Sequence, residues 1–484
     1  MNTFKRKTLH AAVLAGLGAV GIAGTAQAVH VNPEHLGSAL VYPYYTVRAD
    51  GGGTSIAYYD NYMSIVNTTA STKAVKVRFL EGKRSQEVLD FNLFLSAFDV
   101  WTGGIIRTTA AGEGEEGAKL ISTDKSCVVP NALFSTVSTN TANRFKNFAY
   151  AASNDGGGTT LDRTREGYLE VLEMGDVTNT TAIFSAKHVA GVPSNCAYFE
   201  TNDATLGTQM TPPTGGLYGA MSLINVRSGS DFTYDAIALD QWSPATVQYT
   251  PSNSLLPPIG PTGGSTVSNV FTSGGVVAST WLSSRDAVSA TMMQFNLFNE
   301  WVLETATQSG TDWVVTFPTK KLYVAVGAGA AVAPFNANFN NGASCDIFTA
   351  SFYNREEATT LVQAVIIPSP PPVILPSVNS FCYEANVLTF SNSNMLGSTN
   401  GYNVDTTIVG RTGHLVINFD QAVQVLTPTA STINAAAAVP QRHFGLPVVG
   451  FMIEDFANGN VGTPPVLSNY GGNFVHKYRR QITP

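Results

Sequence analysis

Hydrophobic and polar residues alternate with a period of two along much of the chain. In residues 74–81, valine and phenylalanine side chains fall on one side of an extended backbone, and Lys76 and Arg78 fall on the other. Residues 89–95 repeat this alternation with leucine and phenylalanine. A period of two predicts β-strands that are buried on one face and solvated on the other. The chain is therefore expected to have an all-β fold with very little helix.

Two further segments with strand character, residues 301–306 and 313–317, flank a short connector that contains Gly310. Two strand-like segments joined in this way predict a β-hairpin. Residues 284–293 have helical character instead, because apolar residues recur at helical spacing after Ser284, a residue type that caps helices. We expect one short helix there.

Proline and glycine interrupt the strand pattern at two places. Residues 251–264 contain several of each, and residues 368–376 include three consecutive prolines. Proline cannot donate to the hydrogen-bond ladder of a sheet, so both segments are expected to lie outside the strands. We interpret residues 251–264 as a linker between two β-sandwich-like domains, residues 29–250 and 265–484. The second segment is expected to form a Pro-rich loop within the C-terminal domain.

The N-terminus has the three parts of a secretory signal peptide. A basic stretch at residues 5–7 precedes an apolar run at residues 11–23, and Ala26 and Ala28 stand at the −3 and −1 positions of a cleavage site. The alternative, a membrane anchor, needs roughly 20 apolar residues, more than this run provides. We predict export by the Sec route and a mature chain that begins at Val29.

Export would place the four cysteines in an oxidising compartment. They are Cys127, Cys196, Cys345 and Cys382. In an oxidising compartment an even number of cysteines indicates disulfide bonds, and four cysteines allow three pairings. We predict Cys127–Cys196 and Cys345–Cys382, because each bond closes a loop within one half of the chain. Each bond would stabilise the fold by on the order of 3–4 kcal/mol by restricting the unfolded chain.

Charge and hydropathy narrow the range of partners. The formal net charge is −7, and the loss of three basic residues with the signal peptide makes the mature chain more acidic. An acidic chain lacks the positive surface that binds nucleic acid. No apolar stretch of the mature chain approaches the roughly 20 residues of a transmembrane helix. We therefore expect no nucleic-acid partner and no transmembrane helix.

The candidates for metal chemistry are weak. A copper oxygenase with a histidine brace would need His30 as its first residue, whereas cleavage after Ala28 leaves Val29 in that place. Calcium could be bound by the glycine-rich segments at Asp50 and from Asp155 to Asp162. Neither segment matches the known calcium-loop pattern, and flexible turns between strands explain them better. We predict no cofactor, with calcium as the only alternative.

Candidates for hydrolysis are equally weak. The sequence contains no Gly-x-Ser-x-Gly nucleophile elbow. Glu166 and Glu170 would share one face of a strand at about 13 Å, because each residue rises roughly 3.3 Å, and glycosidases use roughly 5–9.5 Å. We expect Glu166, Glu170 and Glu173 to be solvated strand acids paired with Arg163 or Arg165. No catalytic residue is predicted.

Tyrosines are concentrated near the start of the mature chain, at Tyr42, Tyr44 and Tyr45 above all. A tyrosine joins a large apolar area to a polar tip, and so it suits a protein interface or a sugar-stacking platform. Ordinary packing in a sandwich core is the alternative interpretation. We treat the three tyrosines as a candidate interface.

Several longer strings carry a resemblance to known sequences. They are SALVYPYYTVR (38–48), LDRTREGYLEVLEMG (161–175), TDWVVTFPTKK (311–321) and NYGGNFVHKYRR (469–480). The chain resembles, from end to end, a group of uncharacterised exported proteins of Gram-negative bacteria. The resemblance implies a surface or periplasmic location and brings no catalytic residues with it.

These observations favour a non-enzymatic exported protein, located at the cell surface or outside the cell, or else in the periplasm. It would act by binding a cell-surface component or by self-association, as an adhesive or structural component. An outer-membrane β-barrel is one alternative, since it would share the signal peptide, the alternating strands and the aromatic residues. A secreted hydrolase or copper oxygenase is another.

Overall fold

A computed structural model describes most of the chain. It describes residues 27–50, 58–109, 115–135, 141–152, 155–355, 359–360, 366–369, 379–406, 410–419, 422–433 and 440–484. Most of the predicted signal peptide and the three consecutive prolines of the 368–376 segment lie outside these ranges. Strands make up 49% and helices 11%, so the all-β prediction is confirmed. None of the helices in the described residues is long and apolar enough to cross a lipid bilayer.

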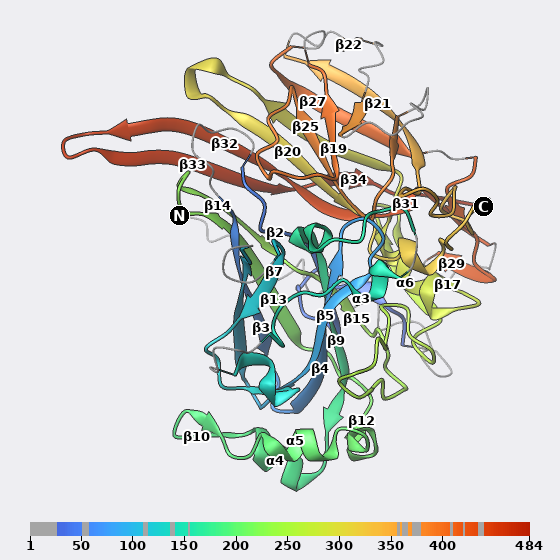
Figure 1. The fold of residues 1–484 in the computed structure, drawn as a ribbon. Helices are drawn as coiled ribbons and strands as arrows, with labels where there is room; N and C mark the ends of the chain where they lie inside the picture. Colours follow the sequence, from blue (N-terminus) through green and yellow to red (C-terminus); the bar gives the residue numbers. More distant parts are fainter. Residues whose placement is uncertain are drawn as a thin grey trace, which may run out of the picture.

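The first half of the chain forms a sandwich of two antiparallel sheets (Figure 1). The larger sheet has the order β1 (His30–Val31), β15 (Ile237–Asp240), β2 (Ala39–Thr46), β9 (Glu166–Val177), β4 (Thr72–Glu81), β5 (Glu87–Leu95) and β8 (Cys127–Val129), with β12 (Met210–Thr211) beside β9. The smaller sheet has the order β14 (Ser230–Asp235), β13 (Leu217–Asn225), β3 (Asp60–Asn67), β6 (Val100–Arg107) and β7 (Ala118–Ile121). The predicted strands at residues 74–81 and 89–95 are β4 and β5.

The second half contributes two more large sheets. One has the order β22 (Thr359–Thr360), β21 (Asp346–Asn354), β27 (Thr412–Phe419), β19 (Asn296–Val302) and β34 (Lys477–Arg479), with β24 (Asn379–Phe381) beside β21. The other has the order β23 (Ile366–Ser369), β26 (Gly401–Val404), β25 (Ala385–Phe390), β20 (Gly310–Thr316), β32 (Val449–Val461) and β33 (Val466–Val475).

Small sheets and short helices complete the described chain. The small sheets are β10 (His188–Val189) with β11 (Val192–Pro193), β16 (Val267–Thr272) with β17 (Gly275–Thr280) and β29 (Ala430–Ile433), β18 (Met293–Gln294) with β31 (Leu446–Pro447), and β28 (Val425–Leu426) with β30 (Arg442–Phe444) and β35 (Gln481–Thr483). The α-helices are α3 (Phe148–Ala151), α4 (Thr180–Ala186), α5 (Ala197–Asn202) and α6 (Ser284–Met292). Helix α6 confirms the predicted helix, although Ser283 is its N-cap and accepts a hydrogen bond from the Asp286 N–H.

The larger first-half sheet is a middle layer of the molecule. Along β2, Ala39 and Val41 pack into one hydrophobic core, whereas Leu40 and Tyr42 pack into another. Successive side chains of a strand point to opposite faces, so this sheet is buried on both sides. Burial on both sides explains why β2 is an almost unbroken apolar run.

The two halves share their cores. The core between the two first-half sheets also contains Val314, Phe451 and Ile453 from the second half. The segment at residues 251–264 lies against the larger sheet, and its Ile259 is 1% exposed within the other core. The expected linker is thus a packed strap, and the boundary there does not separate two independent hydrophobic cores.

The expected solvated face of β4 is covered by this strap. Lys76 donates to the carbonyl oxygens of Pro251 and Ser254, both at 3.2 Å, and Arg78 donates to that of Pro257, also at 3.2 Å. Lys76 and Arg78 are 0% and 6% exposed. The alternation predicted the strand correctly, but it could not show that the polar face would be buried under a distant segment.

The predicted hairpin between residues 301 and 317 is wrong: β20 covers most of the second predicted strand, but of the first only residues 301 and 302 are extended, at the end of β19, and Thr305–Thr307 form a 3-10 helix. Strand β19 pairs with β27 and β34, whereas β20 pairs with β25 and β32 in another sheet. The connector therefore crosses between layers. The indole N–H of Trp313 donates to the Glu300 carbonyl at 3.0 Å, which ties the two layers together.

Candidate functional site

The three tyrosines of the expected interface lie in the core. Tyr42, Tyr44 and Tyr45 are each 0% exposed, and each hydroxyl donates a hydrogen bond inside the protein. The acceptors are the Ser64 carbonyl at 2.7 Å, the Glu166 carboxylate at 2.9 Å and the Thr164 carbonyl at 3.2 Å. These residues are packing residues of β2 and offer no surface for a partner in the folded chain.

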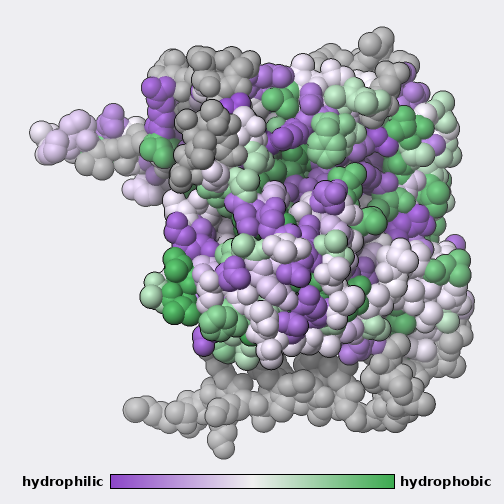
Figure 2. Space-filling model, turned by 60° about the horizontal axis from the view of Figure 1, so that its bottom comes forward, coloured by the Kyte–Doolittle hydropathy of each residue, from purple (hydrophilic) through white to green (hydrophobic). Residues whose placement is uncertain are grey.

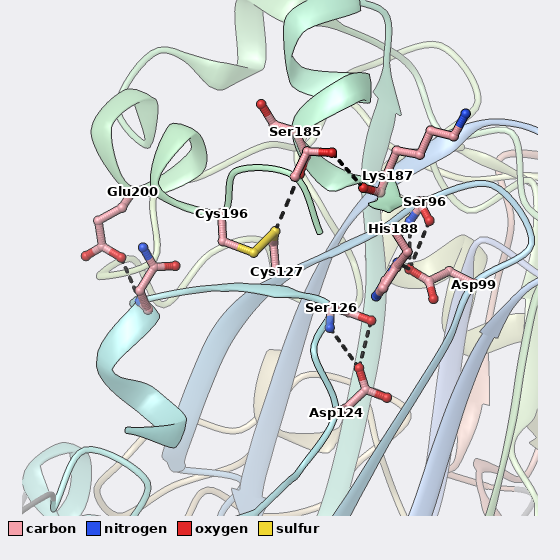
Figure 3. Close-up of a disulfide and its surroundings, with 12 residues drawn as sticks. Ser96, Asp99, Asp124, Ser126, Cys127, Ser185, Lys187, His188, Cys196 and Glu200 are labelled. Atoms are coloured by element: carbon pink, nitrogen blue, oxygen red, sulfur yellow. Dashed lines mark hydrogen bonds and ion pairs between the residues drawn. A yellow bond between two sulfur atoms is a disulfide. The ribbon is translucent and has the colours of Figure 1, made fainter. Parts of the chain in front are cut away.

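The disulfide pairing follows the prediction. Cys127 in β8 is bonded to Cys196, which directly precedes α5 (Figure 3), and Cys345 is bonded to Cys382. The first bond fixes residues 179–209, which we call the helical cap, to the edge of the larger sheet over a small apolar core. No described cysteine is free. Two disulfides indicate an oxidising environment outside the cytoplasm.

The three glutamates of β9 are buried ion pairs and not solvated acids. Glu166, Glu170 and Glu173 are 1%, 2% and 0% exposed. Their partners are neither Arg163 nor Arg165: the shortest N–O distances are 2.6 Å to Arg48, 2.9 Å to Arg78 and 2.7 Å to Lys73. A sheet buried on both faces requires such pairing, because an isolated charge in its interior would be strongly destabilising. These carboxylates hold the structure together.

The glycine-rich segments use their carboxylates in a similar way. Both carboxylate oxygens of Asp155 accept hydrogen bonds from Arg163, and Asp162 pairs with Arg48 and Arg165. The glycines after Asp50 lie outside the described residues. Within the described residues no group of three or more His, Cys, Asp or Glu side chains is arranged to hold a metal ion.

His30 lies in β1, opposite Asp240 of β15. Its ring nitrogen Nδ1 is 3.1 Å from the Ala28 carbonyl oxygen, and its ring meets that of Phe271 edge to face. The neighbouring Val29 is fully buried, and its N–H donates to the Val267 carbonyl at 2.8 Å. The predicted mature N-terminus therefore begins as an integrated part of the fold.

One buried serine has polar neighbours of the kind used in hydrolysis. The Ser85 hydroxyl donates to Glu384 at 2.8 Å and accepts from the Tyr168 hydroxyl at 2.7 Å, beside a pocket of about 150 Å³. Burial raises the pKa of Glu384 to about 7. The serine is only 1% exposed, however, so a substrate carbonyl could not reach its hydroxyl. Burial favours a structural role for this cluster.

A larger opening, of about 840 Å³, lies between the two halves of the chain. We call it the interhalf cleft. The first half contributes Asp50, Tyr59 and Ser230, and the second half contributes most of the remaining lining residues, among them Asp455 and Asn469 of β32 and β33. Most of its lining residues have hydroxyl, amide or carboxylate side chains, and Leu303, Phe390 and Met395 add apolar surface. No local sequence pattern indicates this cleft, because its lining residues come from segments up to hundreds of positions apart.

Strands β32 and β33 form a hairpin that extends from the cleft beyond the body of the molecule (Figure 1). Figure 2 shows the same projection from another side, with its described atoms mostly white to pale purple. Residues 456–475 contain no Asp, Glu, Lys, Arg or His. The pairing of β32 with β33 continues to Val461 and Val466, with one register shift between Ala457 and Asn460, so the projecting part is a two-stranded ribbon with an irregularity near its middle. This uncharged run is the signal by which sequence reasoning could have found the hairpin.

The last strand of this hairpin carries exposed aromatic side chains. Tyr470 and Phe474 on β33 are 62% and 43% exposed. Tyr478, on the following strand β34 in another sheet, is 46% exposed. Part of β33 lies against β14: a side chain at Gly471 would meet the ring of Phe232 at 2.7 Å. The strand is otherwise the last in its sheet.

Comparison with known proteins gives no functional assignment, so the proposal below is based on the geometry of the structure. No protein-family model matches the chain, and no significant match was found among curated proteins or among solved structures.

Proposed function

We propose that this chain is an exported surface or extracellular β protein that acts by self-association, as an adhesive or structural component. The single observation that carries the proposal is the projecting β32–β33 hairpin, an uncharged ribbon whose last strand, β33, pairs with no further strand and is covered by β14 only in part. The signal-peptide pattern, the two disulfides and the resemblance to exported proteins of Gram-negative bacteria support the location.

An open edge strand presents a row of backbone N–H and C=O groups that can pair with another strand. Soluble proteins usually protect such edges with charged side chains or proline. Residues 466–475 of β33 have neither, and the adjacent prolines stand only at the hairpin tip, at Pro464 and Pro465. The edge is thus suited to strand addition.

A second copy of this chain is the partner that the hairpin fits best. In a symmetric contact each hairpin meets the same surface of its partner, so charges near the symmetry axis would lie close to like charges. The absence of charge from residues 456–475 removes that repulsion. Exposed Tyr470 and Phe474 would add aromatic contacts across the pair.

The test is the oligomeric state of the mature protein, measured by size-exclusion chromatography with light scattering. Tyr470→Lys places a like charge on both hairpins of a symmetric contact and is expected to shift the protein toward monomer. Leu282→Lys is the matched control, because Leu282 is 87% exposed and lies outside the hairpin. A wild-type monomer at high protein concentration, or a Tyr470→Lys variant that assembles normally, would refute the proposal.

A further inference from the structure

Tyr59 is a buried tyrosine whose hydroxyl forms no hydrogen bond with any residue that the structure describes. The residue is 2% exposed and lines the interhalf cleft, and its backbone N–H donates to the Arg48 carbonyl at 3.0 Å. None of the described residues forms a hydrogen bond with its hydroxyl, although other buried tyrosines, such as Tyr44 and Tyr168, donate theirs. With no partner among the described residues, this hydroxyl is available to a ligand at the wall of the cleft.

Asp455 lines the same cleft, at the end of a row of core residues on β32. Alternate residues of β32 share one face, and on this face Phe451 and Ile453 belong to the hydrophobic core around Tyr59. Asp455 is the next residue of that row and lines the cleft. The apolar row therefore ends in a carboxylate where the cleft opens.

The Asp455 carboxylate has hydrogen bonds but no cation. It accepts a hydrogen bond from the Ser230 hydroxyl at 3.2 Å, and no Lys, Arg or His of the described chain forms an ion pair with it. Burial and the charge of Asp50 raise its pKa. A carboxylate in this setting is stabilised by a positive charge brought into the cleft.

The charged groups at the other side of the cleft are engaged elsewhere. Glu304 pairs with Arg355 at 3.1 Å, and Arg411 donates to the Leu303 carbonyl at 3.2 Å. Beneath the cleft, Asp312 is fully buried and accepts hydrogen bonds from Ser393 and Leu396. Negative charge is thus concentrated on the side of the cleft where Tyr59 and Asp455 lie.

We propose that the interhalf cleft binds a ligand that carries a protonated primary amine, held by the Asp455 carboxylate and the Tyr59 hydroxyl oxygen. An ammonium group has three N–H donors and no acceptor, which suits a carboxylate without a cation and a tyrosine oxygen that accepts no hydrogen bond from the described residues. The cleft volume of about 840 Å³ is in the range that encloses a short oligomer. The amine belongs to an amino sugar or to a lysine side chain. This inference is independent of the assembly proposed above.

Calorimetry with matched amine and acetylated probes tests the inference on the mature protein. The first pair is a β-1,4-linked glucosamine tetramer and its fully N-acetylated form, and the second is tetralysine with free or acetylated side chains. We expect at least one amine probe to bind, about tenfold more tightly than its acetylated form. Binding of the sugar alone identifies a glycan as the source, and binding of the peptide alone identifies a protein side chain.

Three variants connect the binding to the named residues. Asp455→Asn keeps the shape of the side chain and is expected to weaken amine binding about tenfold, and Tyr59→Phe to weaken it about threefold. Asp235→Asn, at an exposed carboxylate outside the cleft, should leave binding unchanged. The inference is overturned if neither amine binds, if an acetylated probe binds as tightly, or if folded Asp455→Asn and Tyr59→Phe variants both bind like the wild type.

Discussion

Arg48 and Glu166 form a buried ion pair within the first half of the chain, with 2.6 Å between Nε and Oε1. Glu166 also accepts hydrogen bonds from Ser398 and Thr399 of the second half, from the Thr399 hydroxyl at 2.7 Å. Burial raises the pKa of Glu166, but Arg48 and the two hydroxyl groups outweigh burial and hold it below its ordinary value. One carboxylate thus anchors a distant loop to the first-half sheet.

Loss of this arginine should be strongly destabilising. Arg48→Met leaves the Glu166 charge buried without its cation, and such a change typically costs about 3–5 kcal/mol of unfolding free energy. Arg355→Met is the control, because the Arg355–Glu304 pair is exposed and should contribute less than about 1 kcal/mol. Urea unfolding measures both values, and similar losses for the two variants would contradict this account.

Asp312 should give the protein a specific dependence on pH. Burial raises its pKa from 3.8 to about 6. Between these values the folded protein keeps a proton that the unfolded chain has released, so this group lowers stability as pH rises, by about 3 kcal/mol in all, and has no further effect above pH 6. Asp312→Asn should therefore gain stability relative to wild type between pH 4 and pH 7.

The geometry around Asp312 suits this substitution. An asparagine amide can donate to the Ser393 hydroxyl, which itself donates to the Thr311 carbonyl at 2.7 Å, and its oxygen can accept from the Leu396 N–H. Chemical unfolding at both pH values gives the difference. A difference between variant and wild type that is the same at pH 4 and pH 7 would show that Asp312 is ionised throughout.

Removal of the first disulfide should expose the helical cap to protease, whereas removal of the second should lower the overall stability of the protein. Cys127→Ser with Cys196→Ser releases the helical cap, which rests on a small core of its own, and trypsin should then cleave at the exposed Lys187. Cys345→Ser with Cys382→Ser should lower overall stability by about 2–5 kcal/mol and leave the cap protected. Limited proteolysis with mass spectrometry separates these outcomes, and equal cleavage of both variants at Lys187 would contradict them.

Replacement of a core tyrosine by alanine should lower stability far more than replacement of a hairpin tyrosine. Tyr44→Ala removes a buried ring and a hydrogen bond to Glu166, and it should cost about 3–5 kcal/mol of unfolding free energy. Tyr470→Ala removes a mostly exposed ring and should change stability by less than about 0.5 kcal/mol. Thermal unfolding measures the stability of both variants. A Tyr44→Ala variant as stable as the wild type would contradict the core role of Tyr44 and favour a surface role for β2.

Local patterns in the sequence were sufficient for strands, a helix and the disulfides. The period of two identified β4 and β5, and the helical spacing after Ser284 identified α6, because both signals depend on neighbouring residues along the backbone. The disulfide pairs were predictable because each bond closes a loop within one half of the chain.

The environment of each strand face depended on residues far away in the chain. Lys76 and Tyr44 are buried because the strap at residues 251–264 and the second-half sheets cover the first-half sandwich, and no local pattern encodes that cover. The same holds for the cleft, which places Tyr59 beside Asp455 across almost 400 residues of sequence. Alternation shows that a strand has two different faces, but burial is a property of everything packed against them.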